Sequence, residues 1–254
     1  MNESAANSLP TSAPAAIDLS KLHIKGIIFD YGGTIDSHGD HWSEVIWDAY
    51  CQAGVPVDKA TFREAYVAIE RELARVRHIL PHHTFRDLME IKMHLELQWL
   101  ADVGHIAPEQ VEPLAAVTAR LCYEAARASV EDARPVLEAL AARFPMVLVS
   151  NFYGNVEAVL LDFDLRRYFG HIVESAVVGV RKPDPAIFAL GVDALGLTPE
   201  EVLVVGDSYR KDILPARSLG CHTAWLKGKG WTPEEDAQTD PAQIPSLASL
   251  LALS

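Results

Sequence analysis

Short apolar runs that end in polar or turn residues recur along much of the chain. The first covers residues 24–29 and ends in Asp30 and a turn containing two glycines. Runs of this length, bounded by turn residues, are typical of buried parallel strands. An apolar helical face over residues 135–143 lies between two of them, and strands that alternate with helices predict a doubly wound, Rossmann-like parallel sheet of the α/β class. The later strands are expected at residues 146–149, 172–178, 202–205 and 223–226.

The segment from about residue 40 to 128 breaks this alternation, because it contains no convincing strand. Apolar residues spaced by four and three form a helical stripe from Phe62 to Leu80, which Pro81 ends. A further helix is expected over residues 108–127. We therefore predict an inserted all-helical cap, which should cover the carboxyl edge of the sheet, where such sheets bind ligands. Between these helices, Thr84 resembles a new N-terminal cap, followed by the stripe Leu88, Ile91, Leu95 and Trp99.

This organisation divides the chain into three parts. Residues 1–20 are rich in Ala, Ser and Pro and are expected to form a disordered leader. They have neither a basic start nor an apolar centre, so they do not resemble a signal peptide. Residues 21–39 and 129–254 are expected to form one discontinuous α/β core, and residues 40–128 the helical cap.

Composition and charge exclude several classes of protein. The 254 residues carry a formal net charge of −13, which disfavours a nucleic-acid partner, because phosphate backbones are bound by Lys/Arg surfaces. No run of about 20 apolar residues suggests a membrane span. The three cysteines are widely spaced and odd in number, which fits reduced thiols better than disulfides. We expect a cytoplasmic protein that is a monomer or a homodimer.

Four polar residues follow four of the predicted strands, at the edge where ligands are expected. Taken singly, each is ordinary, since an Asp after a strand is usually a turn former and a lone Lys is usually solvated. Together they make a chemical set. Two carboxylates offer the oxygen ligands that Mg²⁺ prefers, a carboxylate can attack phosphorus, and the ammonium and hydroxyl can stabilise phosphoryl oxygens. The four residues are Asp30, Ser150, Lys182 and Asp207.

The sequences around these residues resemble the motifs of the haloacid dehalogenase-like (HAD) hydrolase superfamily. Asp30-Tyr-Gly-Gly-Thr resembles its first motif, Asp-x-Asp-Gly-Thr, and VLVSN at residues 147–151 resembles the second. VRKPDP at residues 180–185 resembles the third, and VGDS at residues 205–208, with Asp212, resembles the fourth. The helical insertion matches the position and character of the family's first-type cap, and the motifs look like those of its phosphatases.

The resemblance implies a Mg²⁺-dependent hydrolase of a small phosphate monoester, in which Asp30 is the nucleophile and forms an aspartyl-phosphate. Mg²⁺ would be held by Asp30, Asp207 and the backbone carbonyl of Gly32. Asp212 would orient Lys182 or a metal-bound water, with Ser208 beside it. The substrate-binding residues would be Ser150, Asn151, Lys182, Gly33 and Thr34, and the first three of these would also be catalytic.

One position departs from the family's pattern. The phosphatases carry a second Asp two residues after the nucleophile, which acts as general acid and then base, and here that position is Gly32. A positioned acid/base is typically worth ~10²–10⁴-fold in rate. A nearby side chain could substitute, and Asp36, His38, Asp40 and His41 follow directly. His38 and His41 are the natural candidates, because the pKa of histidine lies near neutrality. A solvated hinge is the simpler interpretation of both.

Two other functions stay open. Relatives that cleave carbon–halogen or carbon–phosphorus bonds also lack the second Asp. The dehalogenases work without metal and lack the Gly-Asp pair that is present at Gly206-Asp207. The carbon–phosphorus hydrolases need a cap lysine for a Schiff base, whereas Lys59 and Lys92 are more simply solvated helix charges. The other alternative is a protein that binds a phosphorylated ligand with little turnover, although a binder has no need of the nucleophile Asp30.

Overall fold

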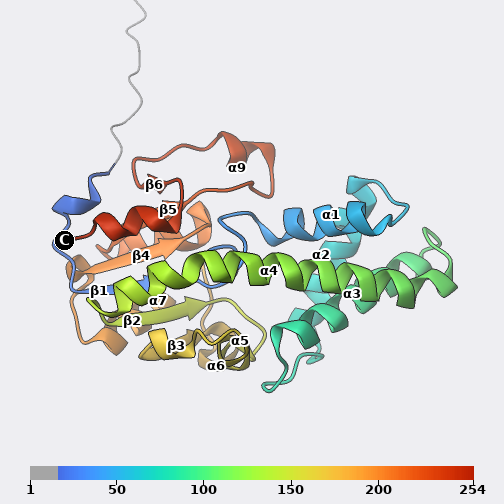
Figure 1. Cartoon of the computed structure of the whole chain (residues 1–254), viewed down its shortest axis with the longest axis horizontal. Coiled ribbons are helices and arrows are strands. Elements are labelled where there is room, and N and C mark those ends of the chain that lie inside the picture. The colour runs from blue at the N-terminus through green and yellow to red at the C-terminus, as the bar shows by residue number, and fades with distance from the viewer. Residues whose placement is uncertain (1–16) are drawn as a thin grey trace, which may run out of the picture.

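The computed structural model describes residues 17–254 (Figure 1), so most of the predicted leader, residues 1–16, lies outside the described residues. Residues 17–20, which the prediction also assigned to the leader, pack against the core instead. The backbone N–H of Ile17 donates to the carbonyl of Pro241 at 2.8 Å, and Leu19 is buried. The apolar side chains of Ile17 and Leu19 explain the difference, because Leu19 belongs to the core cluster and Ile17 packs against it.

A six-stranded sheet in which every pairing is parallel forms the centre of the core, in the order β3-β2-β1-β4-β5-β6. The doubly wound α/β fold is therefore confirmed. The carboxyl end of β1 lies between those of β2 and β4, so the loops that follow these three strands meet at one edge (Figure 1). The strands are β1 (Gly26–Phe29), β2 (Met146–Ser150), β3 (His171–Glu174), β4 (Val202–Gly206), β5 (His222–Leu226) and β6 (Gln243–Ile244).

The predicted strands differ from the observed strands in two places. The strand predicted over residues 172–178 ends at Glu174, and Ser175–Val178 forms the one-turn helix α6. Its apolar residues are not buried, since Val177 is 73% exposed, so the apolar run misled the prediction. The two-residue strand β6 was not predicted, because a strand that short carries no measurable periodicity.

Different helices cover the two faces of the sheet. Side chains alternate along a strand, so Ile27 and Phe29 of β1 join the core cluster that includes helix α4, whereas Ile28 joins the opposite cluster. The opposite cluster is closed by α7 (Ala186–Leu195) and α8 (Leu214–Ser218). Burial of the central strand on both faces accounts for its continuous apolar sequence.

Four helices between β1 and β2 form or enter the cap, as predicted. They are α1 (Trp42–Ala53), α2 (Lys59–Arg75), α3 (Phe85–Asp102) and α4 (Val111–Ala141). α2 ends at Arg75, so Val76 and Leu80 of the predicted stripe lie beyond it and are 40% and 39% exposed. α3 begins with a capping box in which Thr84 and Asp87 each satisfy the backbone N–H of the other, as the cap signal at Thr84 indicated.

Helix α4 is one continuous element where the sequence predicted two. It runs through the predicted cap boundary at residue 128 and contains Pro135 (Figure 1). Proline inside a helix costs about 3 kcal/mol, but each fully buried large apolar side chain returns about 1.5–3 kcal/mol. Val136, Leu137 and Leu140 are all buried against the sheet side, and this burial outweighs the cost of Pro135. One continuous helix, α4, therefore extends from the cap into the core.

The remaining elements are short. Among the described residues, no helix combines the length and apolar character needed to cross a membrane. The short helices are α5 (Val156–Asp162) and α9 (Pro233–Ala237), the 3₁₀ segments Leu19–Lys21, Pro108–Gln110, Arg166–Tyr168, Pro199–Glu201 and Leu247–Ala252, and a π-helical turn at Tyr209–Ile213.

Candidate active site

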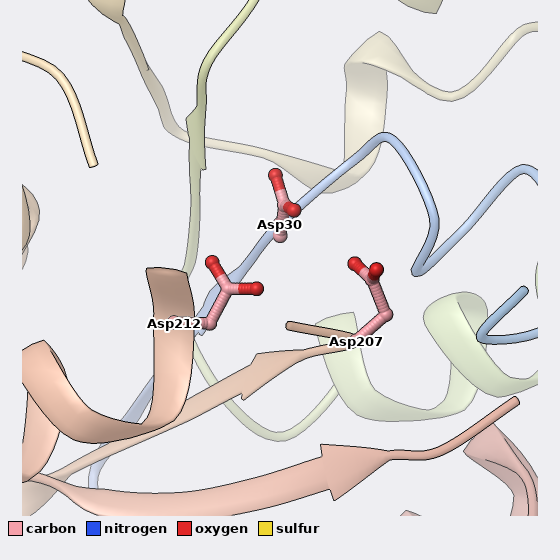
Figure 2. A group of neighbouring side chains, drawn as sticks. All are labelled: Asp30, Asp207 and Asp212. Carbon is pink, nitrogen blue, oxygen red and sulfur yellow. The ribbon is translucent and has the colours of Figure 1, made fainter. Parts of the chain in front are cut away.

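Three carboxylates meet at the carboxyl edge of the sheet (Figure 2). Asp30 follows β1, Asp207 follows β4, and Asp212 lies in the π-helical turn beyond β4. One oxygen from each lies within 4.8 Å of the others. Because β1 and β4 are hydrogen-bonded neighbours, the carboxylates that follow them are brought to the same point. Asp30 and Asp207, which the sequence predicted to share a cation, are therefore adjacent.

Lys182 lies among these carboxylates as a buried cation. Its Nζ is 2.8 Å from Oδ1 of Asp30 and 2.7 Å from Oδ1 of Asp212, and its side chain is 2% exposed. Burial opposes the charge, but the two carboxylates raise the pKa of Lys182 above its usual value. The lysine is thus a fixed positive charge beside the carboxylate of Asp30, and Asp212 is the group that orients it.

Asn151 holds Lys182 through the backbone. The side-chain amide of Asn151 donates to the carbonyl of Lys182 at 3.1 Å, and the backbone N–H of Lys182 donates to Oδ1 of Asn151 at 2.9 Å. Asn151 therefore positions the lysine, and its predicted contact with the transferring group stays a prediction. Ser150, the buried last residue of β2, precedes it at the same edge.

The Asp207 carboxylate is held by a hydrogen bond from Thr34 and lies close to two other carboxylates. Thr34 Oγ donates to its Oδ1 at 3.0 Å. Burial, followed by repulsion from Asp212 and Asp30, raises the pKa of Asp207 well above its ordinary value. Burial also raises the pKa of Asp212 to about 6, and Ser208 N–H donates to that carboxylate at 3.0 Å. A hard divalent cation would relieve this repulsion, so the carboxylate set fits Mg²⁺.

Gly33 and Thr34 shape the loop that follows Asp30. Gly33 has a φ of +93°, and a Cβ at this position would lie 2.4 Å from the carboxyl group of Asp207. Its N–H donates to Oδ1 of Asp36 at 2.8 Å, and the Thr34 hydroxyl donates to Asp207. Their predicted role in substrate binding stays a prediction.

Gly32 has open space around its missing side chain. A Cβ built on Gly32 would meet only Trp42 Cδ1 among the described residues, at 3.9 Å, which is an ordinary van der Waals distance. Crowding therefore does not exclude a Cβ at position 32.

His38 and His41, the candidate substitutes for the acid/base, both contact neighbouring residues. His38 is exposed, and its Nε2 lies 3.1 Å from Asp132. Nδ1 of His41 accepts the backbone N–H of Ser43 at 3.2 Å and so caps α1. Burial lowers the pKa of His41 to about 4, so its imidazole is uncharged at neutral pH. A substitute role for either residue stays a prediction.

Asp36, one of the nearby residues considered as a substitute for the acid/base, helps to form the loop after Asp30. It is buried, and Oδ1 accepts from Gly33 N–H and from the Trp42 indole N–H at 3.0 Å. Burial raises the pKa of Asp36 to about 7. The signal in the sequence was its place among apolar and glycine residues just after the nucleophile, which is unusual for a solvated acid.

The cap carries a buried lysine, and its predicted solvation was wrong. Lys92 is 3% exposed, forms an ion pair with Glu70 of α2, and lies 4.6 Å from the centroid of the Tyr66 ring. Tyr153, on the loop after β2, donates its hydroxyl to Oε1 of Glu70 at 2.9 Å. The bond between Tyr153 and Glu70 thus joins the cap to the loop that begins at Asn151, after β2.

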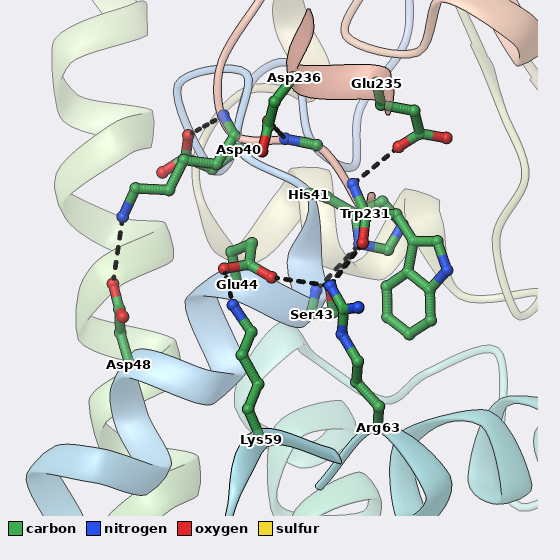
Figure 3. Close-up of polar contacts among 12 residues, drawn as sticks. Asp40, His41, Ser43, Glu44, Asp48, Lys59, Arg63, Trp231, Glu235 and Asp236 are labelled. Atoms are coloured by element: carbon green, nitrogen blue, oxygen red, sulfur yellow. Dashed lines mark hydrogen bonds and ion pairs between the residues drawn. The ribbon is translucent and has the colours of Figure 1, made fainter. Parts of the chain in front are cut away.

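A second contact holds the cap on the other side of the site (Figure 3). The loop after β5 reaches the base of the cap, where the backbone N–H of His41 donates to the carbonyl of Lys229 at 2.8 Å. Arg63 of α2 bonds to the carbonyl of Trp231, with its guanidinium 4.6 Å from the centre of the indole. Glu44 of α1 forms an ion pair with Lys59, so Lys59, like Lys92, has a carboxylate partner. The cap is closed onto two core loops.

Comparison with known proteins agrees with this geometry. The family model "haloacid dehalogenase-like hydrolase" matches residues 24–220. Haloacid dehalogenase-like hydrolase domain-containing protein 3 of Danio rerio is 44% identical over 98 residues, 39% of this chain and 38% of that protein. Phosphoserine phosphatase of Thermus thermophilus is 36% identical over 88 residues, 35% of this chain and 33% of that protein. The chain thus spans well under half the length of these two relatives.

A longer match and two solved structures extend the likeness. Glyceraldehyde 3-phosphate phosphatase of Pyrococcus abyssi is 28% identical over 177 residues, 68% of each chain. A crystal structure of a dehalogenase, at 20% identity, covers 91% of this chain and 97% of its own with a TM-score of 0.60. YfnB of Bacillus subtilis, described as a HAD-hydrolase bound to magnesium, is 20% identical, covers 90% and 97%, and has a TM-score of 0.55. At these identities the structures show the shared fold. The family match over residues 24–220 shows that the chain belongs to the haloacid dehalogenase-like hydrolases.

Proposed function

We propose that the protein is a Mg²⁺-dependent phosphatase of small phosphate monoesters, with Asp30 as the nucleophile. The observation that carries the proposal is the position of the Asp30 carboxylate, just after the central strand, 2.8 Å from Lys182 and grouped with the carboxylates of Asp207 and Asp212. An attacking carboxylate beside a fixed ammonium and a cation site is the set that phosphoryl transfer requires.

The residues fit the metal that the family uses. Asp30, Asp207 and the carbonyl of Gly32 would hold Mg²⁺, because the hydrogen bonds and ion pairs of both carboxylates in residues 17–254 use Oδ1 and leave Oδ2 for a further ligand. Bound there, the ion would neutralise the charge that two carboxylates and a phosphate dianion bring together.

The chain's own groups supply the remaining chemistry. The Asp30 carboxylate attacks phosphorus, the ester P–O bond breaks, and the alcohol leaves, which gives an aspartyl-phosphate on Asp30. Water then attacks this phosphate, releases inorganic phosphate and restores the carboxylate. Lys182, held by Asn151 and Asp212, balances negative charge on the phosphoryl oxygens, and the Ser150 hydroxyl donates to them. The closed cap limits access of bulk water.

Gly32 sets the kinetic character of this phosphatase. With no acid/base at that position, the leaving alkoxide takes its proton from water, so esters of acidic alcohols and phenols react fastest. The same deficit slows the attack of water on the aspartyl-phosphate. We infer a slow enzyme whose covalent intermediate is long-lived.

Carbon–phosphorus cleavage is disfavoured by the cap. It requires a neutral cap amine that can form a Schiff base, whereas Lys92 is buried and ion-paired. Although burial opposes its charge, Glu70 and the neighbouring tyrosines raise the pKa of Lys92 well above its usual value. Carbon–halogen cleavage of the metal-free kind does not explain the Asp207 carboxylate beside Asp30. The names of two relatives, both phosphatases, point the same way.

The test is phosphate release from 4-nitrophenyl phosphate and from alkyl phosphates, with and without Mg²⁺. We expect Mg²⁺-dependent release that is faster for the nitrophenyl ester and is abolished by Asp30→Asn. Tight binding of these esters without turnover would instead support the binding protein, and inactivation by borohydride with an aldehyde-bearing phosphonate would support carbon–phosphorus cleavage.

A further inference from the structure

Glu70 lies on a cap helix, α2, that spans the carboxyl edge of the sheet. Its carboxylate accepts the hydroxyl of Tyr153, which is on the loop after β2, three residues beyond Ser150. The same helix also contacts the loop after β5, because Arg63 bonds to the carbonyl of Trp231 and the Tyr66 ring lies 5.5 Å from the Trp231 indole. β1 and β4 lie between β2 and β5 in the sheet, so α2 passes over the end of β1, which Asp30 follows.

Glu70 is also accessible, unlike its ion-pair partner. Its side chain is 33% exposed, whereas that of Lys92 is 3% exposed. Lys92 and the nearer hydrogen bond from Tyr153 both use Oε1, and within residues 17–254 Oε2 receives only the longer contact from Tyr153, at 3.3 Å. Burial opposes the charge, but Lys92 and Tyr153 hold the pKa of Glu70 below its usual value. The cap therefore presents an ionised carboxylate with an acceptor oxygen to spare.

The neighbouring cap groups offer no competing charge. The Tyr66 hydroxyl remains protonated, because burial raises its pKa well above the usual value. His41 is uncharged at neutral pH, for the reason given above. Lys92 is enclosed by Glu70 and the face of the Tyr66 ring, so it fixes Glu70 and does not meet a substrate directly.

We propose that Glu70 is the specificity-determining residue of the cap and that its Oε2 accepts a hydrogen bond from a hydroxyl or ammonium group on the leaving group of the phosphate ester. This inference rests on the proposed phosphatase function, since it assigns the substrate class of the same site. A purely apolar leaving group would leave Oε2 with only the 3.3 Å contact from Tyr153 beneath the closed cap, and the loss of a hydrogen bond at such a site discriminates between substrates.

Three probes of nearly equal size test the proposal: propyl phosphate, 2-hydroxyethyl phosphate and 2-aminoethyl phosphate. Their dissociation constants are measured by calorimetry on the Asp30→Asn variant with Mg²⁺, in which turnover does not interfere. We expect the two donor-bearing esters to bind about 10- to 100-fold more tightly than propyl phosphate. The ratio between the amino and hydroxy esters then tells which donor Glu70 prefers.

The decisive variant is the double change Glu70→Gln with Lys92→Met, added to Asp30→Asn, because removing Glu70 alone would leave a buried ammonium unpaired. It should abolish the preference for 2-aminoethyl phosphate over propyl phosphate. If it does not fold, Glu70→Asp keeps the ion pair while drawing the oxygens back, and should weaken the same preference. Glu96→Gln is the matched control: this cap acid is fully buried and hydrogen-bonded to Tyr50, so the preference should persist.

Equal affinity for all three esters, no binding of either donor-bearing ester, or a preference that survives the loss of Glu70 would overturn the proposal. The proposed function is tested separately by turnover of the same esters in the wild-type enzyme. Binding with the expected preference but without Asp30-dependent phosphate release would refute the phosphatase and leave the role of Glu70 standing.

Discussion

Gly32 and Gly33 are neighbours in sequence with opposite constraints. Gly32 has open space around its missing Cβ, whereas a Cβ on Gly33 would collide with the carboxyl group of Asp207. We predict that Gly32→Asp restores acid/base chemistry and raises phosphate release from alkyl phosphates by about 10²-fold or more. Gly33→Ala should displace Asp207 and abolish release. The measurement is kcat/KM for both variants at saturating Mg²⁺, and equal effects of the two changes would contradict the assignment.

Glu96 is a buried acid that makes stability depend on pH. Burial raises its pKa to about 7 from a usual value of 4.5, so the native state binds more protons than the unfolded state between these values. Stability should therefore fall as pH rises from about 4.5 to 7. The shift corresponds to about 3 kcal/mol. We expect the unfolding free energy of Glu96→Gln, relative to wild type, to rise by about that amount between pH 4.5 and 8.

Urea unfolding at several pH values measures this effect. Glu90→Gln, an exposed change on the same helix, is the control and should keep the pH dependence of wild type. A difference between Glu96→Gln and wild type that does not change with pH would show that Glu96 is not protonated in the native state.

The positions of Asp30 and Asp207 could be predicted, and the contacts that support the site could not. Each follows a strand, and the tips of neighbouring parallel strands must meet. Lys182 reaches Asp30 although it lies beyond helix α6 and does not directly follow β3. Which atoms Asn151 and Thr34 contact depends on loop conformation and side-chain rotamers, which the sequence does not encode in any local pattern. The sequence therefore did not show their hydrogen bonds to Lys182 and Asp207.

At the scale of the elements, the start of α3 depends on its capping box. Thr84 and Asp87 satisfy two backbone N–H groups at the first turn of a helix that carries Lys92 and much of the cap core. We predict that Thr84→Ala lowers the unfolding free energy by about 1 kcal/mol. Thr232→Ala, at the cap of the short exposed helix α9, should cost less than about 0.5 kcal/mol. Similar losses in both variants, in chemical denaturation, would argue against the capping box.

Periodicity located the helices better than it located their buried faces. The predicted apolar stripe of α3 contained Leu88, Ile91, Leu95 and Trp99, and only Leu88 of these is fully buried. The centre of the buried face is rotated toward Met89, Lys92 and Met93. Charged residues there were read as solvated because an isolated buried charge is costly. The partner that offsets this cost, Glu70, lies on another helix and cannot be recognised from the sequence of α3.

At the scale of the whole molecule, the alternation of strands and helices was enough to predict the sheet and the inserted cap. Closure of the cap was expected only in outline. The contacts that produce it join residues far apart in the chain, such as Arg63 with Trp231 and Glu70 with Tyr153. Likewise, Pro135 signalled a helix boundary that the burial of its neighbours overrides. These are tertiary effects that outweigh local propensity.

The central claim is that Asp30 becomes phosphorylated and, without an acid/base at Gly32, stays phosphorylated for much of the catalytic cycle. The most direct measurement is acid quenching of the enzyme during turnover of 4-nitrophenyl phosphate with Mg²⁺, followed by mass spectrometry of the peptide that contains residue 30. A phosphoryl group on Asp30 that accumulates in wild type and largely disappears in Gly32→Asp is the predicted result. Phosphate release in wild type with an unmodified Asp30 at every time point would contradict the account.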